Sequence, residues 1–395
     1  MLRTSPLIVA TTLGLSVLGG CASQTPSAST SIPAESNDLQ QQVVDTYAEQ
    51  VYQQYSAALA DALKLQASID TFLAEPSDAK LAEVKQAWLV SRESYGLTEA
   101  HRFYGGPIDG VDETTGEEGP EGLLNSWPLN EAAIDYVAGN PSAGIINQPD
   151  APLTIEALAE ANQVVDEADV TTGYHAIEFL LWGQDFAVDG PGSRPVSDYV
   201  DGPNHERRKV YLAKVTTKLI NDLQFLVEAW APEADNYRAT FVAQPTSQTL
   251  SDVLSAQATL AGFELASERI GVPLDSGDQE DEHSCFADNT HRDYVQNVQG
   301  IVEVWLGPEQ PGGLQLVVAQ SDPAAAAKVT DALGQALVYA NMIDKLAPVD
   351  AMLAGGAENP GRQALESLSN QLIVAAEAMV EAGEASGLEV VIGGE

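Results

Sequence analysis

Residues 39–74 have the sequence LQQQVVDTYAEQVYQQYSAALADALKLQASIDTFLA, which places an apolar residue at every fourth position. The apolar set is Val43, Tyr47, Val51, Tyr55, Leu59 and Leu63. Side chains three or four residues apart lie on one face of an α-helix, so this spacing predicts a long helix with one buried face. Further helical patterns lie at 78–104, 206–230, 246–270, 289–306, 322–346 and 361–387, whereas the alternation typical of strands is scarce. The fold is therefore predicted to be all-α and built from packed helical bundles.

The organisation of the chain suggests two bundles. Two long loops rich in glycine, proline and carboxylates, 105–122 and 183–205, interrupt the first half, and APEADNY at 231–237 marks a boundary. We predict an N-terminal bundle over 39–235 and a C-terminal bundle over 236–395.

A faint internal repeat connects the two halves. TEAHRFYGGPID at 98–109 resembles FELASERIGVPLD at 263–275, and GYHAIEFLLWG at 173–183 resembles QGIVEVWLG at 299–307. Two matches in the same order predict a duplication, with chance similarity between amphipathic helices as the alternative.

The N-terminus has the pattern of a bacterial lipoprotein. Residues 1–20 form a predicted signal peptide, in which an apolar run at 7–18 is too short for a membrane span. The run ends in LGGC, so Cys21 is the predicted site of lipidation and membrane attachment. Ala22 after the cysteine favours the outer membrane over the inner one. Residues 21–38 are rich in Ser, Thr and Pro and are predicted to be a flexible tether.

The charge balance excludes one class of partner. The formal net charge is -40, which repels phosphate backbones and argues against nucleic-acid binding. Such a surface attracts cations, although it also keeps a protein soluble in a salty habitat.

The helix predicted from GYHAIEFLLWGQD, residues 173–185, carries His175 and Glu178 among apolar residues. Residues three apart share a helix face, so both side chains can reach one point and hold a metal ion. A buried carboxylate needs compensation, which a metal or a buried ion pair with Arg92 or Arg102 would provide. From the pair alone, the ion pair is the simpler interpretation. The HExxH signature of zinc proteases is absent, because Phe179 occupies the second histidine position.

Two neighbouring segments offer further polar groups. SRESYGLTEAHRFYGGPID, residues 91–109, supplies Glu99 and Glu93 as candidate oxygen ligands. Residues expected to line the site are Arg102, Tyr104, Asp109, Trp127 and Gly173. Trp127 lies in NSWPLNEAAIDYV, residues 125–137, which has the pattern of a helix start and is expected to contribute by packing.

A second cluster lies in DEHSCFADNTHRDY, residues 281–294, and contains His283, Cys285, Asp288 and His291. A cysteine beside two histidines suits zinc or copper. The alternative is a polar cap, in which Asp288 begins the helix that continues to Trp305.

The segments at 91–109, 173–185 and 281–294 together resemble the imelysin family, including its iron-regulated protein A branch, over about residues 40–385. The most specific match is the GxHxxE motif, formed here by Gly173, His175 and Glu178. The resemblance implies two similar helical bundles, a site near their interface, and His175 and Glu178 as ligands of iron or zinc.

The expected function is that of a lipid-anchored metal-binding protein of iron acquisition in the cell envelope. Its partners would be a metal ion or iron-containing ligand and components of an iron transporter. A zinc-dependent peptidase and a structural lipoprotein without ligand are the alternatives.

Overall fold

The structure is a computed structural model that describes residues 34–111, 116–308 and 312–393. The predicted signal peptide at 1–20, the lipidation site Cys21 and most of the predicted tether lie outside the described residues. Within the described residues the chain forms helices and only isolated β-bridges, so the all-α prediction is confirmed. None of the helices in these three ranges is both long enough and apolar enough to cross a membrane.

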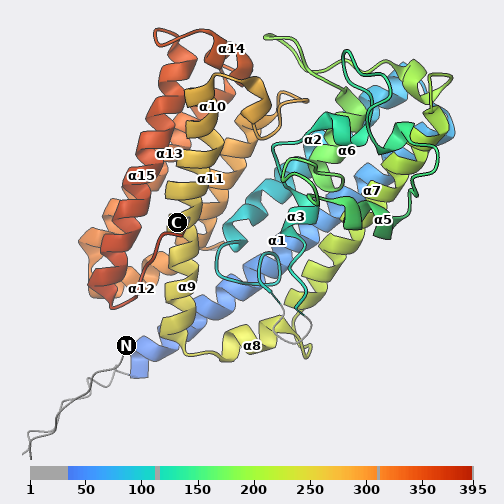
Figure 1. Ribbon diagram of the computed structural model, residues 1–395. Coiled ribbons are helices and arrows are strands. Elements are labelled where there is room, and N and C mark those ends of the chain that lie inside the picture. The colour runs from blue at the N-terminus through green and yellow to red at the C-terminus, as the bar shows by residue number, and fades with distance from the viewer. Residues whose placement is uncertain (1–33, 112–115, 309–311, 394–395) are drawn as a thin grey trace, which may run out of the picture.

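The first group of helices forms the bundle on the right of Figure 1. Its long members are α1 (Ala34–Ala74), α2 (Asp78–Thr98), α6 (Gly173–Trp182) and α7 (His205–Trp230). Short elements connect them: η1 (Glu99–His101), α3 (Glu121–Leu124), α4 (Glu131–Ile134), η2 (Ile145–Asn147), α5 (Ile155–Ala161) and η3 (Val196–Tyr199). The chain then crosses to the other group through α8 (Tyr237–Ala243).

The second group forms the bundle on the left of Figure 1. Its long members are α9 (Thr246–Thr259), the wider-wound π-helical stretch η4 (Leu260–Gly271), α11 (Thr290–Leu306), α13 (Pro323–Asp344) and α15 (Pro360–Ser386). The short members are α10 (Val272–Ser276), η5 (Gln279–Asp281), α12 (Leu314–Ser321) and α14 (Val349–Ala354). The predicted bundle boundary and the duplication stay predictions.

Helix α1 buries most of the stripe expected from the sequence. Val43, Tyr47, Val51 and Tyr55 are buried, whereas Leu63 is 45% exposed. A four-residue step overshoots the helical turn of about 3.6 residues by roughly 40°, so a strict four-residue series drifts off the buried face. The end of the helix therefore uses a shifted set of core residues: Leu65, Ile69 and Phe72.

The structure corrects three predicted boundaries. Helix α1 begins at Ala34, so the last residues of the predicted 21–38 tether are helical. Helix α2 ends at Thr98 and the chain continues as η1 to His101, short of the expected end at residue 104. Segment 125–137 forms only the one-turn α4, capped by the Asn130 side chain at Ala132 N, and Ser126 begins no helix.

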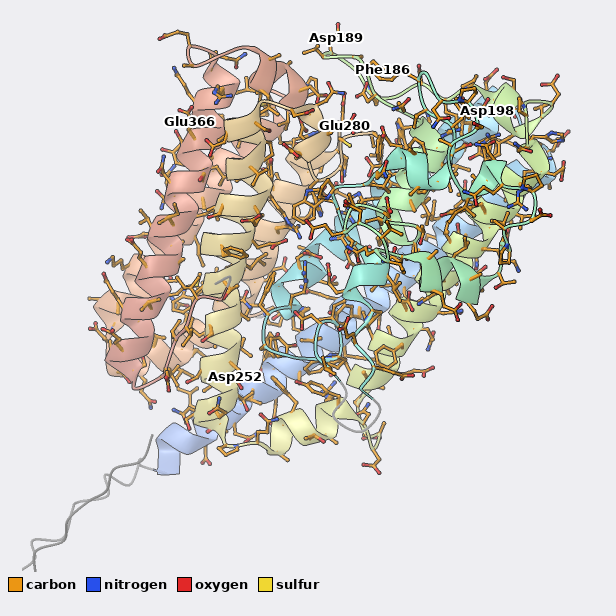
Figure 2. The ribbon with its side chains drawn as sticks, viewed as in Figure 1. Phe186, Asp189, Asp198, Asp252, Glu280 and Glu366 are labelled. Carbon is orange, nitrogen blue, oxygen red and sulfur yellow. The ribbon has the colours of Figure 1, made fainter. Side chains whose placement is uncertain are left out.

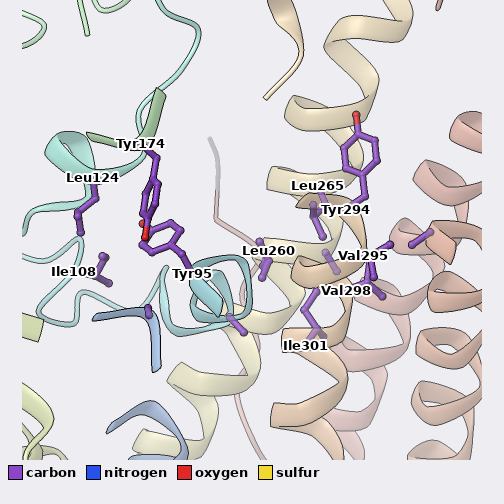
Figure 3. Close-up of a cluster of buried hydrophobic side chains, with 14 of the residues drawn as sticks. Tyr95, Ile108, Leu124, Tyr174, Leu260, Leu265, Tyr294, Val295, Val298 and Ile301 are labelled. Carbon is purple, nitrogen blue, oxygen red and sulfur yellow. The ribbon is translucent and has the colours of Figure 1, made fainter. Parts of the chain in front are cut away.

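The two bundles meet where α11 packs against α2. Glycine permits the approach: a Cβ on Gly300 would lie 2.6 Å from Leu97 O, and one on Gly96 would lie 2.7 Å from Gln296 Cβ. Buried side chains from both bundles belong to one continuous apolar core, with Tyr95 and Tyr174 on one side and Leu260 and Val298 on the other (Figure 3). The polar groups discussed next are embedded in this interface.

Candidate functional site

Helix α6 is buried along its whole length. Its first residue, Gly173, has a φ of +84°, and a Cβ there would lie 2.5 Å from Leu124 O. Only glycine accepts both this backbone conformation and this close approach. The glycine of the GxHxxE motif thus fixes where α6 begins and how His175 is aimed.

His175 and Glu178 contact each other directly, with 2.8 Å between His175 Nδ1 and Glu178 Oε2. The second carboxylate oxygen of Glu178 accepts a hydrogen bond of 2.9 Å from Ala287 N in the segment before α11. Nε2 of His175 is buried and has no hydrogen-bond partner. In this arrangement Glu178 orients the imidazole, and Nε2 is the atom left to bind something.

A second imidazole lies beside the first. The rings of His175 and His283 meet edge to face with centroids 4.8 Å apart. His283 Nδ1 lies 3.0 Å from Asp293 Oδ2, and its Nε2 lies 3.4 Å from Asn125 Nδ2. Asp293 is held in turn by Arg92, whose Nη2 donates a bond of 2.9 Å to Oδ1. Each histidine therefore contacts its own carboxylate through Nδ1.

Both imidazoles are held in the neutral form. Burial lowers the pKa of His175 well below its ordinary value, with the neighbouring His283 as the next cause. Burial and the nearby Arg269 lower the pKa of His283 to about 4. Burial also raises the pKa of Glu178 well above the ordinary glutamate value. A neutral imidazole is the form that ligates metals, so neither histidine first has to lose the second ring proton of an imidazolium at neutral pH.

An ion network that joins the two bundles lies next to the histidine site. Arg269 Nη2 lies 2.6 Å from Glu99 Oε2 and 2.8 Å from Glu264 Oε1, while Arg102 Nη1 lies 3.0 Å from Glu99 Oε2. The π-helical winding of η4 brings residues five apart onto one face, which pairs Glu264 with Arg269. Burial alone would raise the pKa of Glu99, but Arg269 and Arg102 lower it to about 2.

These contacts revise the role predicted for Glu99 and Glu93. Glu99 is bound by two guanidinium groups and by Asn125 Nδ2 at 3.2 Å, so it serves the ion network and does not face His175 as a free ligand. Glu93 is half-exposed and makes a two-pronged ion pair with Arg292 at 2.7 and 2.8 Å.

The expected lining residues separate into two places. Trp127 lies at the site: its ring meets His283 at 4.6 Å between centroids, and Arg269 lies 5.1 Å from its ring. Tyr104 lies away from the two histidines, against Tyr47 and Phe241. Asp109 accepts a hydrogen bond from Phe103 N and supports the loop that follows η1.

The second predicted cluster is divided by the structure. His283 joins His175, and Cys285 is a free buried thiol whose pKa is raised by burial and by Glu178. Asp288 lies outside α11, with a φ of +54°, so it shares no helix face with His291 and does not begin the helix. His291 lies instead 3.7 Å from Asp344. The structure therefore does not bring these four residues together around one ion, and the polar cap begun by Asp288 is not formed either.

The two histidines can supply part of the ligand set of a metal ion. His175 Nε2 is a buried nitrogen with no partner, and His283 Nε2 has only the long contact to Asn125. In the part of the chain that the structure describes, the one group of three or more His, Cys, Asp or Glu side chains close enough to share an ion is elsewhere: Asp185, Asp288 and Asp350. The histidine site thus offers two protein ligands and leaves other positions to water or to a chelating molecule.

Sequence reasoning missed three members of the site: Asn125, Arg269 and Asp293. The internal repeat carried a signal for Arg269, because it aligned the Glu and Arg of 263–275 with those of 98–109. Asp293 is the second-to-last residue of the segment 281–294 that contains the predicted second cluster. Nothing in the local pattern around Asn125 distinguishes it.

Comparison with known proteins supports the same relationship. The peptidase M75 (imelysin) family model matches residues 51–379. Iron-regulated protein A of Synechococcus elongatus is 26% identical over 299 residues, which cover 72% of this chain and 70% of the relative.

Two solved structures share the fold. A protein from Parabacteroides distasonis, named as an iron-regulated protein A precursor, has a TM-score of 0.68 and 17% identity, covering 90% of this chain and 97% of its own. An imelysin-like protein from Psychrobacter arcticus has a TM-score of 0.60 and 15% identity, covering 92% and 99%. At such identities the likeness concerns the fold alone.

Proposed function

Because the chain belongs to the imelysin family, we propose that it binds a metal ion, foremost iron, as cargo during iron acquisition in the cell envelope. The name of the relative from Synechococcus elongatus, iron-regulated protein A, supports the link to iron. The lipoprotein pattern of residues 1–21 supports an envelope location and favours the outer membrane. The partners that we propose are components of an iron transporter.

The observation that carries the proposal is the buried, unpartnered Nε2 of His175. A buried polar atom without a partner is costly and calls for an explanation. Here the rest of the ring is fixed, since Nδ1 contacts Glu178, which is itself anchored by Ala287 N. A carboxylate behind a histidine is the arrangement that orients metal-binding imidazoles.

The chemistry of the site follows from its two nitrogens and their carboxylates. Imidazole nitrogen suits ferrous iron and zinc, so the cargo is a borderline divalent ion held by His175 and His283. Because burial keeps a proton on Glu178, its carboxyl group donates to His175 Nδ1 and the ring proton lies on Nε2. A cation that binds Nε2 would displace that ring proton to solvent, while the Glu178 proton moves to Nδ1 and leaves a carboxylate charge that balances the cation. Both histidines are almost fully buried, so a cation reaches them only when part of the surrounding structure moves.

The peptidase alternative needs a carboxylate that is free to activate water. Both oxygens of Glu178 are engaged, one with His175 and one with Ala287 N, so this carboxylate is not free in the present arrangement. The sequence prediction that Glu178 is itself a ligand becomes, in our proposal, an orienting role behind His175.

Calorimetric titration of tag-free protein with Fe²⁺ without oxygen, and separately with Zn²⁺, tests the proposal. We expect His175→Ala to weaken binding of the preferred ion at least tenfold, or about 1.4 kcal/mol. His205→Ala is the control, because His205 is partly exposed and contacts only Gly202 O and Glu206. Equal affinity of wild type and His175→Ala for both ions would show that the His175–Glu178 pair is structural.

A further inference from the structure

A second group of polar side chains lies outside the histidine pair, where two loops and the start of α14 meet. Oxygen atoms of Asp185, Asp288 and Asp350 all lie within 4.8 Å of one another. Asp185 follows α6 in the first bundle, Asp288 precedes α11, and Asp350 belongs to α14 in the second bundle. Figure 2 shows the loop that follows α6, marked by Phe186 and Asp189, extending from the first bundle toward the second.

The charge of this cluster is not compensated by the protein. Asp185 and Asp350 are 2% and 3% exposed, and Asp350 has no N–H or hydroxyl donor on either oxygen. Asp185 uses one oxygen to accept a hydrogen bond from Ala187 N and leaves Oδ2 without a partner. A fourth carboxylate, that of Glu282, is buried beside Asp350. Buried carboxylates without cation or donor are strongly unfavourable, so the arrangement calls for a ligand.

The effect on protonation agrees with this geometry. Burial, together with the neighbouring carboxylates, raises the pKa of Asp350 to about 8 and that of Asp288 to about 9. The charged groups that act on these two residues are other carboxylates, including Asp185 and Glu282. A bound cation would remove this repulsion.

We propose that Asp185, Asp288 and Asp350 form a binding site for a calcium-like divalent cation that links the two bundles. The donors are all oxygen, which selects a hard cation. Ca²⁺ takes six to eight oxygen ligands in a flexible geometry, whereas Mg²⁺ is usually held by one or two carboxylates and keeps several waters. Three carboxylates whose oxygens all lie within 4.8 Å of one another therefore suit Ca²⁺ better.

The position of this site gives it a structural consequence. Asp288 directly follows Ala287, whose N–H binds Glu178. A cation on Asp288 and Asp185 would hold the 277–289 segment against the end of α6, and this segment carries His283. The proposed cation would thus fix the distance between the two bundles beside the histidine site.

Titration of the full chain with CaCl₂ after chelator treatment tests the site, with MgCl₂ as the second probe. We expect wild type to bind one Ca²⁺ and to bind Mg²⁺ more weakly, and Asp350→Asn to weaken Ca²⁺ binding at least tenfold. Asp189→Asn is the matched control, because it makes the same substitution in the loop that carries Asp185, at an exposed position outside the cluster. Unchanged affinity in Asp350→Asn, or preference for Mg²⁺, would overturn the proposal.

Thermal unfolding provides a second measurement whose sign distinguishes a site from a merely structural cluster. In excess chelator, Asp350→Asn is expected to melt at or above the wild-type temperature, because it removes a buried carboxyl group that repels its neighbours whenever it is ionised. Added Ca²⁺ should raise the melting temperature of wild type and of His175→Ala, but not that of Asp350→Asn. A wild type that does not respond to Ca²⁺ would refute the cation site and leave the proposal for His175 unaffected.

Discussion

His175 and His283 meet edge to face at 4.8 Å between ring centroids, although one belongs to α6 and the other to the segment before α11. Each ring contacts a carboxylate through Nδ1: Glu178 for the first and Asp293 for the second. The two bundles therefore each contribute one oriented imidazole to a shared buried site. The GxHxxE motif accounts for only half of this arrangement.

The pairing predicts that His283 matters for metal binding as much as His175 does. His283→Ala removes one of the two imidazoles and should weaken Fe²⁺ or Zn²⁺ binding about tenfold or more in calorimetric titration. His291→Ala removes a histidine from the same stretch of sequence, but this side chain lies near Asp344 and should leave the affinity unchanged. Equal effects of the two substitutions would contradict a site centred on His283.

Gly173→Ala should destabilise the protein by at least about 2 kcal/mol, because alanine is strained at a φ of +84° and its Cβ collides with Leu124 O. Urea unfolding followed by circular dichroism measures the loss. Gly190→Ala is the control, since a Cβ there meets nothing within 4 Å, and its effect should stay within about 0.5 kcal/mol. Similar stabilities of the two variants would show that the backbone conformation at Gly173 does not require glycine.

The helices themselves could be predicted from the sequence because their signal is local. The apolar stripe of residues 43–59 and the caps at Ser77 and Asp322 depend only on neighbours in the chain. Helix ends that depend on distant groups could not be predicted. Helix α2 gives way to η1 at Glu99, whose carboxylate is held by Arg269 of the other bundle.

The candidate site was predictable only where its residues are close in sequence. His175 and Glu178 share one turn of a helix, so their contact follows from spacing. Proximity in the sequence groups His283 with Cys285 and His291, because the sequence offers no other guide to which residues meet. Packing of α11 against α2 instead separates these residues and brings His283 to His175.

A second ion network, centred on Asp135, gives a prediction about stability. Asp135 is fully buried and lies 2.9 Å from Arg194 Nη1 and 2.6 Å from Arg208 Nε. Asp135→Asn leaves two buried guanidinium groups with less compensation and should cost on the order of 3 kcal/mol in urea unfolding. Asp201→Asn, at an exposed position between Arg194 and Arg208 in the sequence, should change stability by less than about 0.5 kcal/mol. A loss equally small in Asp135→Asn would show that the arginines find other partners.

Glu99 should make the stability of the protein depend on pH in the acid range. Its pKa is lowered to about 2 in the folded protein, against an ordinary value of 4.5, because Arg269 and Arg102 outweigh the effect of burial. A group with a depressed folded pKa stabilises the protein fully above its unfolded pKa, and this contribution disappears as the pH falls through the folded pKa. The shift corresponds to roughly 3 kcal/mol that is present at pH 7 and lost between about pH 5 and pH 2. Glu99→Gln should therefore be less stable than wild type at pH 7, and the difference should shrink steadily between about pH 5 and pH 3.

Urea unfolding at a series of pH values measures this difference. Glu93→Gln is the control, because Glu93 pairs with Arg292 at a half-exposed position where solvent screens the interaction. Its stability should follow that of wild type at every pH. If the free energy of unfolding of wild type and of Glu99→Gln changed with pH in parallel, the charge of Glu99 would not be needed to stabilise the buried Arg269 and Arg102. Glu264 and Glu121, which also pair with these arginines, would then carry the network that joins the two bundles.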